Sequence, residues 1–265
     1  MRPNCRRFHE RWKIRGSGHF NEQDGRPVFV WADERVLNHG SLVSRISREP
    51  SGGSTVNNKK WRLRTTRASE EVKLRHRQIK VDGNDIFYRE DGPADGPVLL
   101  LPHGYPCSSY QFRRLMPALA DRWHTISPDF PGFGYSATPE ISEFGYDFDA
   151  YAGFLAAFAD ALGLRRYALW LHDYGSQIGL RHAIANPERI AALIIQNGDI
   201  YEDVLGPKYA AIKAYWNEKT PQKHRPLEEA VSEEGFKHEF IGEVSDDVAE
   251  RVPPDLWKLH WPLMD

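Results

Sequence analysis

The sequence has only two cysteines, Cys5 and Cys107, which lie far apart in the chain. A framework of disulfide bonds is therefore excluded, and we predict a protein of the reducing cytoplasm. The sequence also lacks an apolar run long enough to cross a bilayer. Arg6 and Arg7 resemble the start of an export signal, but no apolar segment follows them. We therefore expect no association with a membrane.

Motifs that bind metals and phosphates are missing as well. No group of His, Cys, Asp and Glu residues has the spacing of a metal site, and no glycine-rich phosphate loop occurs. We therefore predict neither a metal ion nor a cofactor.

The small net charge of −2 hides two parts of opposite sign. Residues 1–75 carry 17 Lys and Arg against 8 Asp and Glu, whereas residues 76–265 carry 18 against 29. The first part is rich in Gly, Ser and Asn and has no persistent apolar period, which predicts a basic, disordered extension or translated sequence upstream of the true start. A nucleic-acid-binding arm is the other interpretation, but no binding motif accompanies the charge, and we predict no nucleic-acid partner.

From residue 76 onward, predicted strands alternate with predicted helices. Residues 76–90 predict a hairpin around the turn Asp82-Gly83-Asn84. Apolar runs predict buried strands at 98–101, 124–127, 167–171 and 190–195. Helices are predicted from Ser108 or Ser109 to Leu119, over 148–162 with a stop at Gly163, and over 177–183. This alternation predicts an α/β fold with a parallel sheet and right-handed crossovers.

Residues 170–176, Trp-Leu-His-Asp-Tyr-Gly-Ser, lie where a predicted strand meets a predicted helix. A side chain at the tip of such a turn, followed two residues later by Gly175, has the layout of a nucleophile elbow. Here that side chain is the carboxylate of Asp173, which can attack saturated carbon and form an ester. A buried Asp that caps the following helix is the alternative. Leu171 is larger than the small residue usual at its position, which predicts a looser turn.

Three motifs follow one another along this part of the chain. They are His103-Gly104-Tyr105-Pro106, the segment Asp129 to Ser136 with the pattern D-x-P-G-x-G-x-S, and His172-Asp173-Tyr174-Gly175. Together they resemble the α/β-hydrolase family, in its epoxide hydrolase and haloalkane dehalogenase branch, over residues 76–265. The resemblance implies a mostly parallel sheet with helices on both faces and a helical cap. Residues 76–200 would then be the N-terminal part of the core, and residues 201–265 part of the cap.

The resemblance also implies a role for each motif residue. Asp173 would attack the substrate carbon, and the backbone N–H groups of Tyr105 and Tyr174 would form the oxyanion hole used when water splits the ester. Gly104 would allow the close approach of the oxyanion loop. His103 is expected to support that loop through a hydrogen bond rather than act as a base.

The nature of the leaving group depends on two positions. In haloalkane dehalogenases of this branch, an Asn in the first motif and a Trp after the nucleophile grip the departing halide. Tyr105 and Tyr174 stand at those positions here, which favours an epoxide-like substrate. In the epoxide hydrolases that the chain resembles, cap tyrosines protonate the departing alkoxide. Tyr209 and Tyr215 are the candidates, with packing as the alternative role of each.

The family places its base, a His, near the C-terminus after an acid and two further strands. None of His182, His224, His238 and His260 follows a predicted buried strand, and Asp199 is a candidate acid or a loop cap. We therefore expect a C-terminally truncated chain whose last strands and helices are missing, so that water is not activated. Residues 193–195 would then form an exposed apolar edge of the sheet.

Three functions remain open at this point. We favour an epoxide hydrolase-like enzyme that acts on a small apolar organic substrate through Asp173. The first alternative is a halide-releasing dehalogenase. The second is a truncated, inactive remnant that only binds a ligand or a partner. The exposed edge would allow a homo-oligomer or a second chain that completes the sheet.

Overall fold

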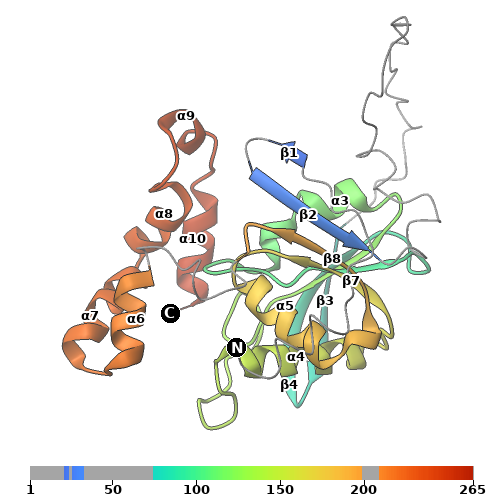
Figure 1. Cartoon of the computed structure of the whole chain (residues 1–265), viewed down its shortest axis with the longest axis horizontal. Coiled ribbons are helices and arrows are strands. Elements are labelled where there is room, and N and C mark those ends of the chain that lie inside the picture. The colour runs from blue at the N-terminus through green and yellow to red at the C-terminus, as the bar shows by residue number, and fades with distance from the viewer. Residues whose placement is uncertain (1–20, 24–25, 33–73, 199–208, 265) are drawn as a thin grey trace, which may run out of the picture.

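The computed structural model describes residues 21–23, 26–32, 74–198 and 209–264 (Figure 1). In this part of the chain, eight strands form one sheet in the order β1-β2-β8-β7-β5-β6-β4-β3. The strands are β1 (Asn21–Gln23), β2 (Arg26–Ala32), β3 (Arg75–Val81), β4 (Asn84–Asp91), β5 (Val98–Leu100), β6 (His124–Pro128), β7 (Tyr167–Leu171) and β8 (Ile190–Gln196). The four central strands, β5 to β8, run parallel, whereas the strands on either side of them are antiparallel. The predicted α/β fold and its buried strands are confirmed.

The predicted hairpin is also confirmed. Strands β3 and β4 pair from Arg75 opposite Glu90 to Val81 opposite Asn84. Asp82 and Gly83 between them have φ angles of 47° and 85°. Positive φ at both turn residues is the geometry that matches the right-handed twist of the two strands, and Asp-Gly adopts it readily.

Helical segments cover both faces of the sheet. They are η2 (Ser109–Phe112), α3 (Leu115–Leu119), α4 (Phe148–Ala161), α5 (Tyr174–Ala185) and η3 (Pro187–Arg189). Because side chains alternate along a strand, Leu99 packs on one face with Phe112 and Met116, whereas Leu100 packs on the other face with Phe158. The sheet is therefore buried between two apolar layers, which explains its nearly continuous apolar strands.

Helix α4 begins and ends where its sequence predicts. The Asp147 side chain accepts a hydrogen bond of 2.7 Å from the N–H of Ala150 and so caps the first turn. Gly163 follows the helix with a φ of 67°, the left-handed conformation that ends many helices. The buried face of α4 includes Phe154 and Phe158, which pack against the strands.

The helix predicted from Ser108 to Leu119 is wrong in its length, because the structure divides it. Ser108 caps the 3-10 turn η2, and a separate short helix, α3, begins at Leu115. Pro117 explains the division. Proline has no N–H and fits the first turn of a helix, but its ring would clash in the interior of a longer one.

The prediction that residues 193–195 form an exposed edge is also wrong. Strand β2 pairs antiparallel with β8, with Val30 opposite Ile194, and β1 pairs with β2 in turn. Two short parts of the predicted extension are therefore strands of the sheet. The rest of residues 1–73 lies outside the described residues, so the boundary at residue 75 stays a prediction.

Residues 209–264, the described part of the segment predicted to be a cap and called the cap below, are mostly helical. It contains α6 (Ala210–Asn217), α7 (Pro221–Ala230), α8 (Glu233–Ile241), α9 (Asp246–Ala249), α10 (Asp255–His260) and η6 (Trp261–Leu263). These helices stand together at one side of the sheet (Figure 1). Ser108 Oγ and His260 Nε2 lie 3.2 Å apart, so α10 is tied to the core. No helix in the described ranges is long and apolar enough to span a bilayer.

Candidate active site

Three loops meet at the carboxyl ends of neighbouring strands. The segment with His103 follows β5, the segment that begins at Asp129 follows β6, and Asp173 follows β7. The chain passes from β5 to β6 on one side and later to β7 on the other side of β5. Such a reversal opens a crevice at the carboxyl ends of the strands, which is where α/β sheets bind their ligands.

The turn at Asp173 has the strained geometry of an elbow. Asp173 has φ 51° and ψ −131°, a combination that a non-glycine residue rarely adopts. A Cβ atom on Gly175 would lie 2.2 Å from the carbonyl oxygen of Pro102, so only glycine fits there. A Cβ on Gly179 would lie 2.3 Å from Leu171 Cδ2. The space at Gly179 therefore accommodates the large Leu171 side chain, and the elbow forms despite it.

One oxygen of the Asp173 carboxylate is held by two backbone donors. The N–H of Tyr105 donates to Asp173 Oδ1 at 2.7 Å, and the N–H of Tyr174 donates to the same oxygen at 2.6 Å. A Cβ on Gly104 would lie 2.5 Å from this oxygen, so a side chain there would block the approach. Asp173 is at once the N-cap of α5 and the residue displayed at the tip of the turn.

This arrangement separates the two oxygens of one carboxylate. The N–H donors and the N-terminus of α5 fix Oδ1 by charge-assisted hydrogen bonds. An attack would then use Oδ2, and Oδ1 would become the carbonyl oxygen of the resulting ester. When water adds to such an ester, the negative charge develops on Oδ1, where both donors are already in place.

His103 joins its own loop to the loop after β6. Its imidazole is buried, with Nδ1 3.0 Å from the carbonyl oxygen of Gly104 and Nε2 accepting from the N–H of Phe130 at 3.1 Å. These contacts fix a neutral tautomer that carries its proton on Nδ1. Burial lowers the pKa of His103 to about 4, against a weaker opposing effect of Asp129.

A buried polar cluster behind the loop includes residues that the motifs alone did not assign. Asp129 Oδ1 accepts from the N–H of Ser109 at 2.7 Å and from its hydroxyl, and Asp129 Oδ2 accepts from the N–H of Tyr135 at 2.9 Å. Arg89 from β4 donates to the Ser109 hydroxyl and lies 3.8 Å from Asp129 Oδ1. The cluster fixes the loops after β5 and β6 relative to each other, which is a positioning role.

Cys107 lies beside the site but is a poor nucleophile. Burial, and then the charge of Asp173, raise the pKa of its thiol to about 12. Only the thiolate attacks carbon or binds a metal, and at neutral pH this thiol is protonated. The structure therefore favours a packing role for Cys107.

Aromatic side chains from the core and the cap pack against Tyr105 and Tyr174. The rings of Tyr105 and Tyr174 are 5.5 Å apart, and Phe148 of α4 meets Tyr174 edge to face at 5.1 Å. From the cap, Phe236 of α8 packs against Tyr105 at 5.9 Å. Glu239 follows Phe236 by three residues, so both lie on one face of α8. The sequence analysis did not single out Phe236 or Glu239, because a cap helix shows its partner face only in the folded chain.

Both predicted cap acids belong to the region of α6. Tyr209 is the N-cap residue of α6. Tyr215, within α6, packs its ring 5.1 Å from that of His224 in α7. Asp199, the candidate acid, lies outside the described residues. The packing role is therefore the one that the structure supports for Tyr215.

Two other candidate histidines are engaged away from the elbow. The Tyr167 hydroxyl lies 2.6 Å from His182 Nε2 in the core, and burial lowers the pKa of His182 to about 4. His260 places Nδ1 2.5 Å from the carbonyl oxygen of Leu256 and Nε2 beside Ser108. Neither ring is directed at Asp173 by these contacts.

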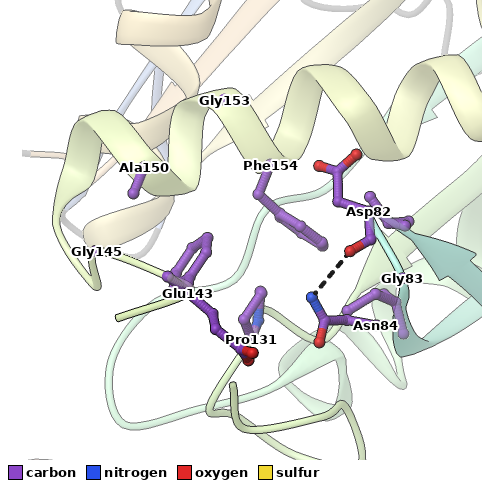
Figure 2. Close-up of a pocket in the computed structure, with 12 residues that line it drawn as sticks. Asp82, Gly83, Asn84, Pro131, Glu143, Gly145, Ala150, Gly153 and Phe154 are labelled. Carbon is purple, nitrogen blue, oxygen red and sulfur yellow. Dashed lines mark hydrogen bonds between the residues drawn. The ribbon is translucent and has the colours of Figure 1, made fainter. Parts of the chain in front are cut away.

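A separate cavity of about 750 Å³ lies between the β3–β4 turn and α4 (Figure 2). The Asp82 and Glu143 carboxylates, Asn84 and the ring of Phe154 line it. Asn84 Nδ2 donates to the backbone oxygen of Asp82 at 3.4 Å. No candidate catalytic residue lines this cavity, so it is distinct from the site at Asp173. Among the residues with described positions, no cluster of His, Cys, Asp and Glu could hold a metal ion.

Comparisons with known proteins agree with this geometry. Residues 97–240 match the family model described as the alpha/beta hydrolase fold, which is more than half of the chain. The chain belongs to the α/β-hydrolase family. The matched range contains the segments of all three motifs, residues 103–106, 129–136 and 172–175.

Several curated relatives carry names from the branch that the motifs resemble. An uncharacterized hydrolase of Saccharomyces cerevisiae is 41% identical over 144 residues, which are 54% of this chain and 49% of the relative. Haloalkane dehalogenase 2 of Mycobacterium tuberculosis is 38% identical over 112 residues, which are 42% of this chain and 38% of the relative. The chain thus spans about half or less of the length of the curated relatives it matches. The solved structure of Cfl2 from Burkholderia cenocepacia superposes with a TM-score of 0.53 at 27% identity, covering 67% of this chain and 64% of that one.

Proposed function

We propose that this α/β-hydrolase acts by covalent catalysis, with Asp173 as the nucleophile toward an epoxide of a small apolar molecule. The observation that carries the proposal is the hold on Asp173 Oδ1 by the N–H groups of Tyr105 and Tyr174, at 2.7 and 2.6 Å. This contact orients the carboxylate and prepares the oxyanion hole in one arrangement.

The reaction would proceed in two steps. Asp173 Oδ2 forms a bond to a ring carbon of the epoxide, the C–O bond of the ring breaks, and the departing oxygen takes up a proton to become a hydroxyl. Hydrolysis of this ester is the second step, and it needs a base that takes a proton from water. The charge would then rest on Oδ1 in the oxyanion hole, and collapse would release a diol and the Asp173 carboxylate. The aromatic side chains around the site would bind the apolar part of the substrate.

Release of a halide is the second candidate function. It is supported by the named relative of Mycobacterium tuberculosis, a haloalkane dehalogenase. The phenols of Tyr105 and Tyr174 favour the epoxide instead, because an alkoxide requires a proton and a halide does not. The same nucleophile would serve both reactions.

The test compares two substrates on the same protein. Consumption of 1,2-epoxyhexane and bromide release from 1-bromohexane are measured for the wild type, Asp173→Asn and Asp82→Asn, whose carboxylate is exposed and lies away from the elbow. We expect Asp173→Asn to abolish the reaction with the epoxide and Asp82→Asn to retain it. Full activity of Asp173→Asn would reject the nucleophile, and bromide release without reaction of the epoxide would favour the dehalogenase.

A further inference from the structure

Phenol side chains are carried by the two residues whose backbone N–H groups hold Asp173 Oδ1. Tyr105 belongs to the loop after β5, and Tyr174 is the first residue of α5. Their ring centroids are 5.5 Å apart, with an angle of 32° between the ring planes. The backbone N–H of each residue also contacts Asp173 Oδ1. Both side chains therefore leave the backbone beside the carboxylate.

The surroundings of the two rings are mostly apolar. Phe148 meets Tyr174 edge to face at 5.1 Å, and Phe236 meets Tyr105 at 5.9 Å. Phe236 in turn packs on Trp261 at 5.7 Å, so the cap shields this part of the site. Hydrogen bonds to a charge that forms in such a shielded place are stronger than in water.

The two phenols are held in their protonated form. Burial raises the pKa of Tyr105 to about 12, with smaller contributions from Tyr174 and Glu239. Burial also raises the pKa of Tyr174 to about 12, with smaller contributions from Asp173 and Glu239. At neutral pH each group is therefore an O–H donor, and the cap carboxylate of Glu239 favours that form.

We propose that the phenol groups of Tyr105 and Tyr174 donate the proton to the oxygen that departs from the substrate when Asp173 attacks. This inference rests on the proposed function. As Asp173 Oδ2 bonds to carbon, the C–O bond breaks with its electron pair on oxygen, and one phenol transfers its proton to that oxygen. The products of the step are a hydroxyl group and a phenolate, hydrogen-bonded by the second phenol. The phenolate regains a proton from the water that attacks the ester.

The assignment replaces the cap tyrosines in this role. Tyr215 packs against His224 within the cap, whereas Tyr105 and Tyr174 contact the nucleophile through their own backbones. Tyr105 and Tyr174 occupy the positions at which dehalogenases of the resembling branch bind the halide. Their phenols would thus act as acids for an oxygen leaving group.

The test measures the first step alone, by the mass gained on Asp173. The protein is mixed with 1,2-epoxyhexane or with 1-iodohexane, whose leaving iodide takes up no proton. The variants are Tyr105→Phe, Tyr174→Phe, their combination, and Tyr215→Phe as the matched control with the same change in the cap. The initial rate of esterification is followed for each.

We expect the double variant to lose about 100-fold or more in the rate with the epoxide, since general acids contribute that much, and to change little with the iodide. Tyr215→Phe should match the wild type with both reagents. Equal loss with both reagents would show a structural role, and no loss with the epoxide, or a selective loss in Tyr215→Phe, would overturn the assignment. A wild type that neither reagent esterifies would reject the proposed function, and this inference with it.

Discussion

At the scale of single residues, the absence of a side chain at Gly104 is as important as any group in the site. A Cβ at this position would lie 2.5 Å from Asp173 Oδ1. Gly104→Ala must therefore displace the loop or the carboxylate and disturb the donor N–H of Tyr105. Since loss of one oxyanion donor costs about 10²–10³ in rate, we expect a loss of that order in the reaction with an epoxide.

Gly153→Ala is the matched control for this change. Gly153 lies within α4, and a Cβ there would have no atom within 4 Å. The substitution should stabilise the fold by about 0.5–1 kcal/mol and leave the activity unchanged. Equal activity of the two variants, measured beside their thermal unfolding, would contradict the account of Gly104.

The thiol of Cys107 gives a second prediction at this scale. Its pKa of about 12 leaves almost no thiolate at pH 8. The folded protein should therefore keep Cys107 unmodified by iodoacetamide at pH 8, whereas protein unfolded in urea should be modified there, as read from the mass of the peptide. Rapid modification in the folded state would show that the thiol is less shielded than its contacts indicate.

At the scale of elements, the hydrogen bond between Ser108 and His260 joins α10 to the core. Ser108→Ala would leave His260 Nε2 buried without that donor, at a cost of about 1–3 kcal/mol. We expect a lower urea midpoint and faster amide exchange in residues 255–260.

Ser232→Ala is the control, because Ser232 caps α8 by accepting from Gly235 at 3.0 Å within the cap. It should speed exchange in α8 rather than in α10. If Ser108→Ala left the exchange of α10 unchanged, the junction between cap and core would not depend on this contact.

The elements also show what the sequence can predict and what it cannot. Local patterns were sufficient for α4 and its stop at Gly163, and for the hairpin at Asp82-Gly83. They failed where the outcome depends on distant partners. The division of the helix at Pro117 reflects the competition between an apolar period and a missing donor, and the pairing of β2 with β8 joins segments more than 150 residues apart.

In the candidate site, too, some residues could be predicted from local motifs and others could not. The three motifs lead to Asp173 and its donors, because strand ends and glycines leave a local signature. The cluster of Arg89, Ser109 and Asp129 forms only when two loops meet, and Glu239 reaches the site only when the cap packs on the core. Long-range contacts of this kind cannot be read from a single sequence.

At the scale of the whole molecule, the sheet is completed by residues near the N-terminus. A chain that begins at Leu74 would lack β1 and β2 and expose β8, whose Leu193 and Ile194 are apolar. Because an open apolar edge pairs with other chains, we expect this shorter protein to oligomerise or aggregate in size-exclusion chromatography, unlike the full chain. A shorter chain that stays monomeric and unfolds at the same temperature would contradict the pairing of β2 with β8.

The stability of the whole fold should depend on buried neutral histidines. Burial lowers the pKa of His103 and of His182 to about 4 from 6.5, so below pH 6.5 the unfolded chain binds protons that the folded chain does not. Their contribution to stability is complete above pH 6.5 and is lost as the pH falls toward 4, at up to about 1.4 kcal/mol per pH unit for each group.

Urea unfolding between pH 7 and pH 5 measures this loss in a range above the ordinary titration of carboxylates. If His182→Gln folds, its urea midpoint should depend less steeply on pH. The wild type alone shows whether the midpoint falls as the pH falls. A midpoint that rises or stays constant as the pH falls through this range would contradict the neutral state of the two rings.

The central claim is that the carboxylate of Asp173 forms an ester with the substrate. The most direct measurement is peptide mass mapping of the protein quenched in acid within the first turnover of 1,2-epoxyhexane. The account predicts one added molecule of epoxide, located on Asp173 and absent in Asp173→Asn. A modification on any other residue, or product formation with no ester on Asp173 at any time, would contradict it.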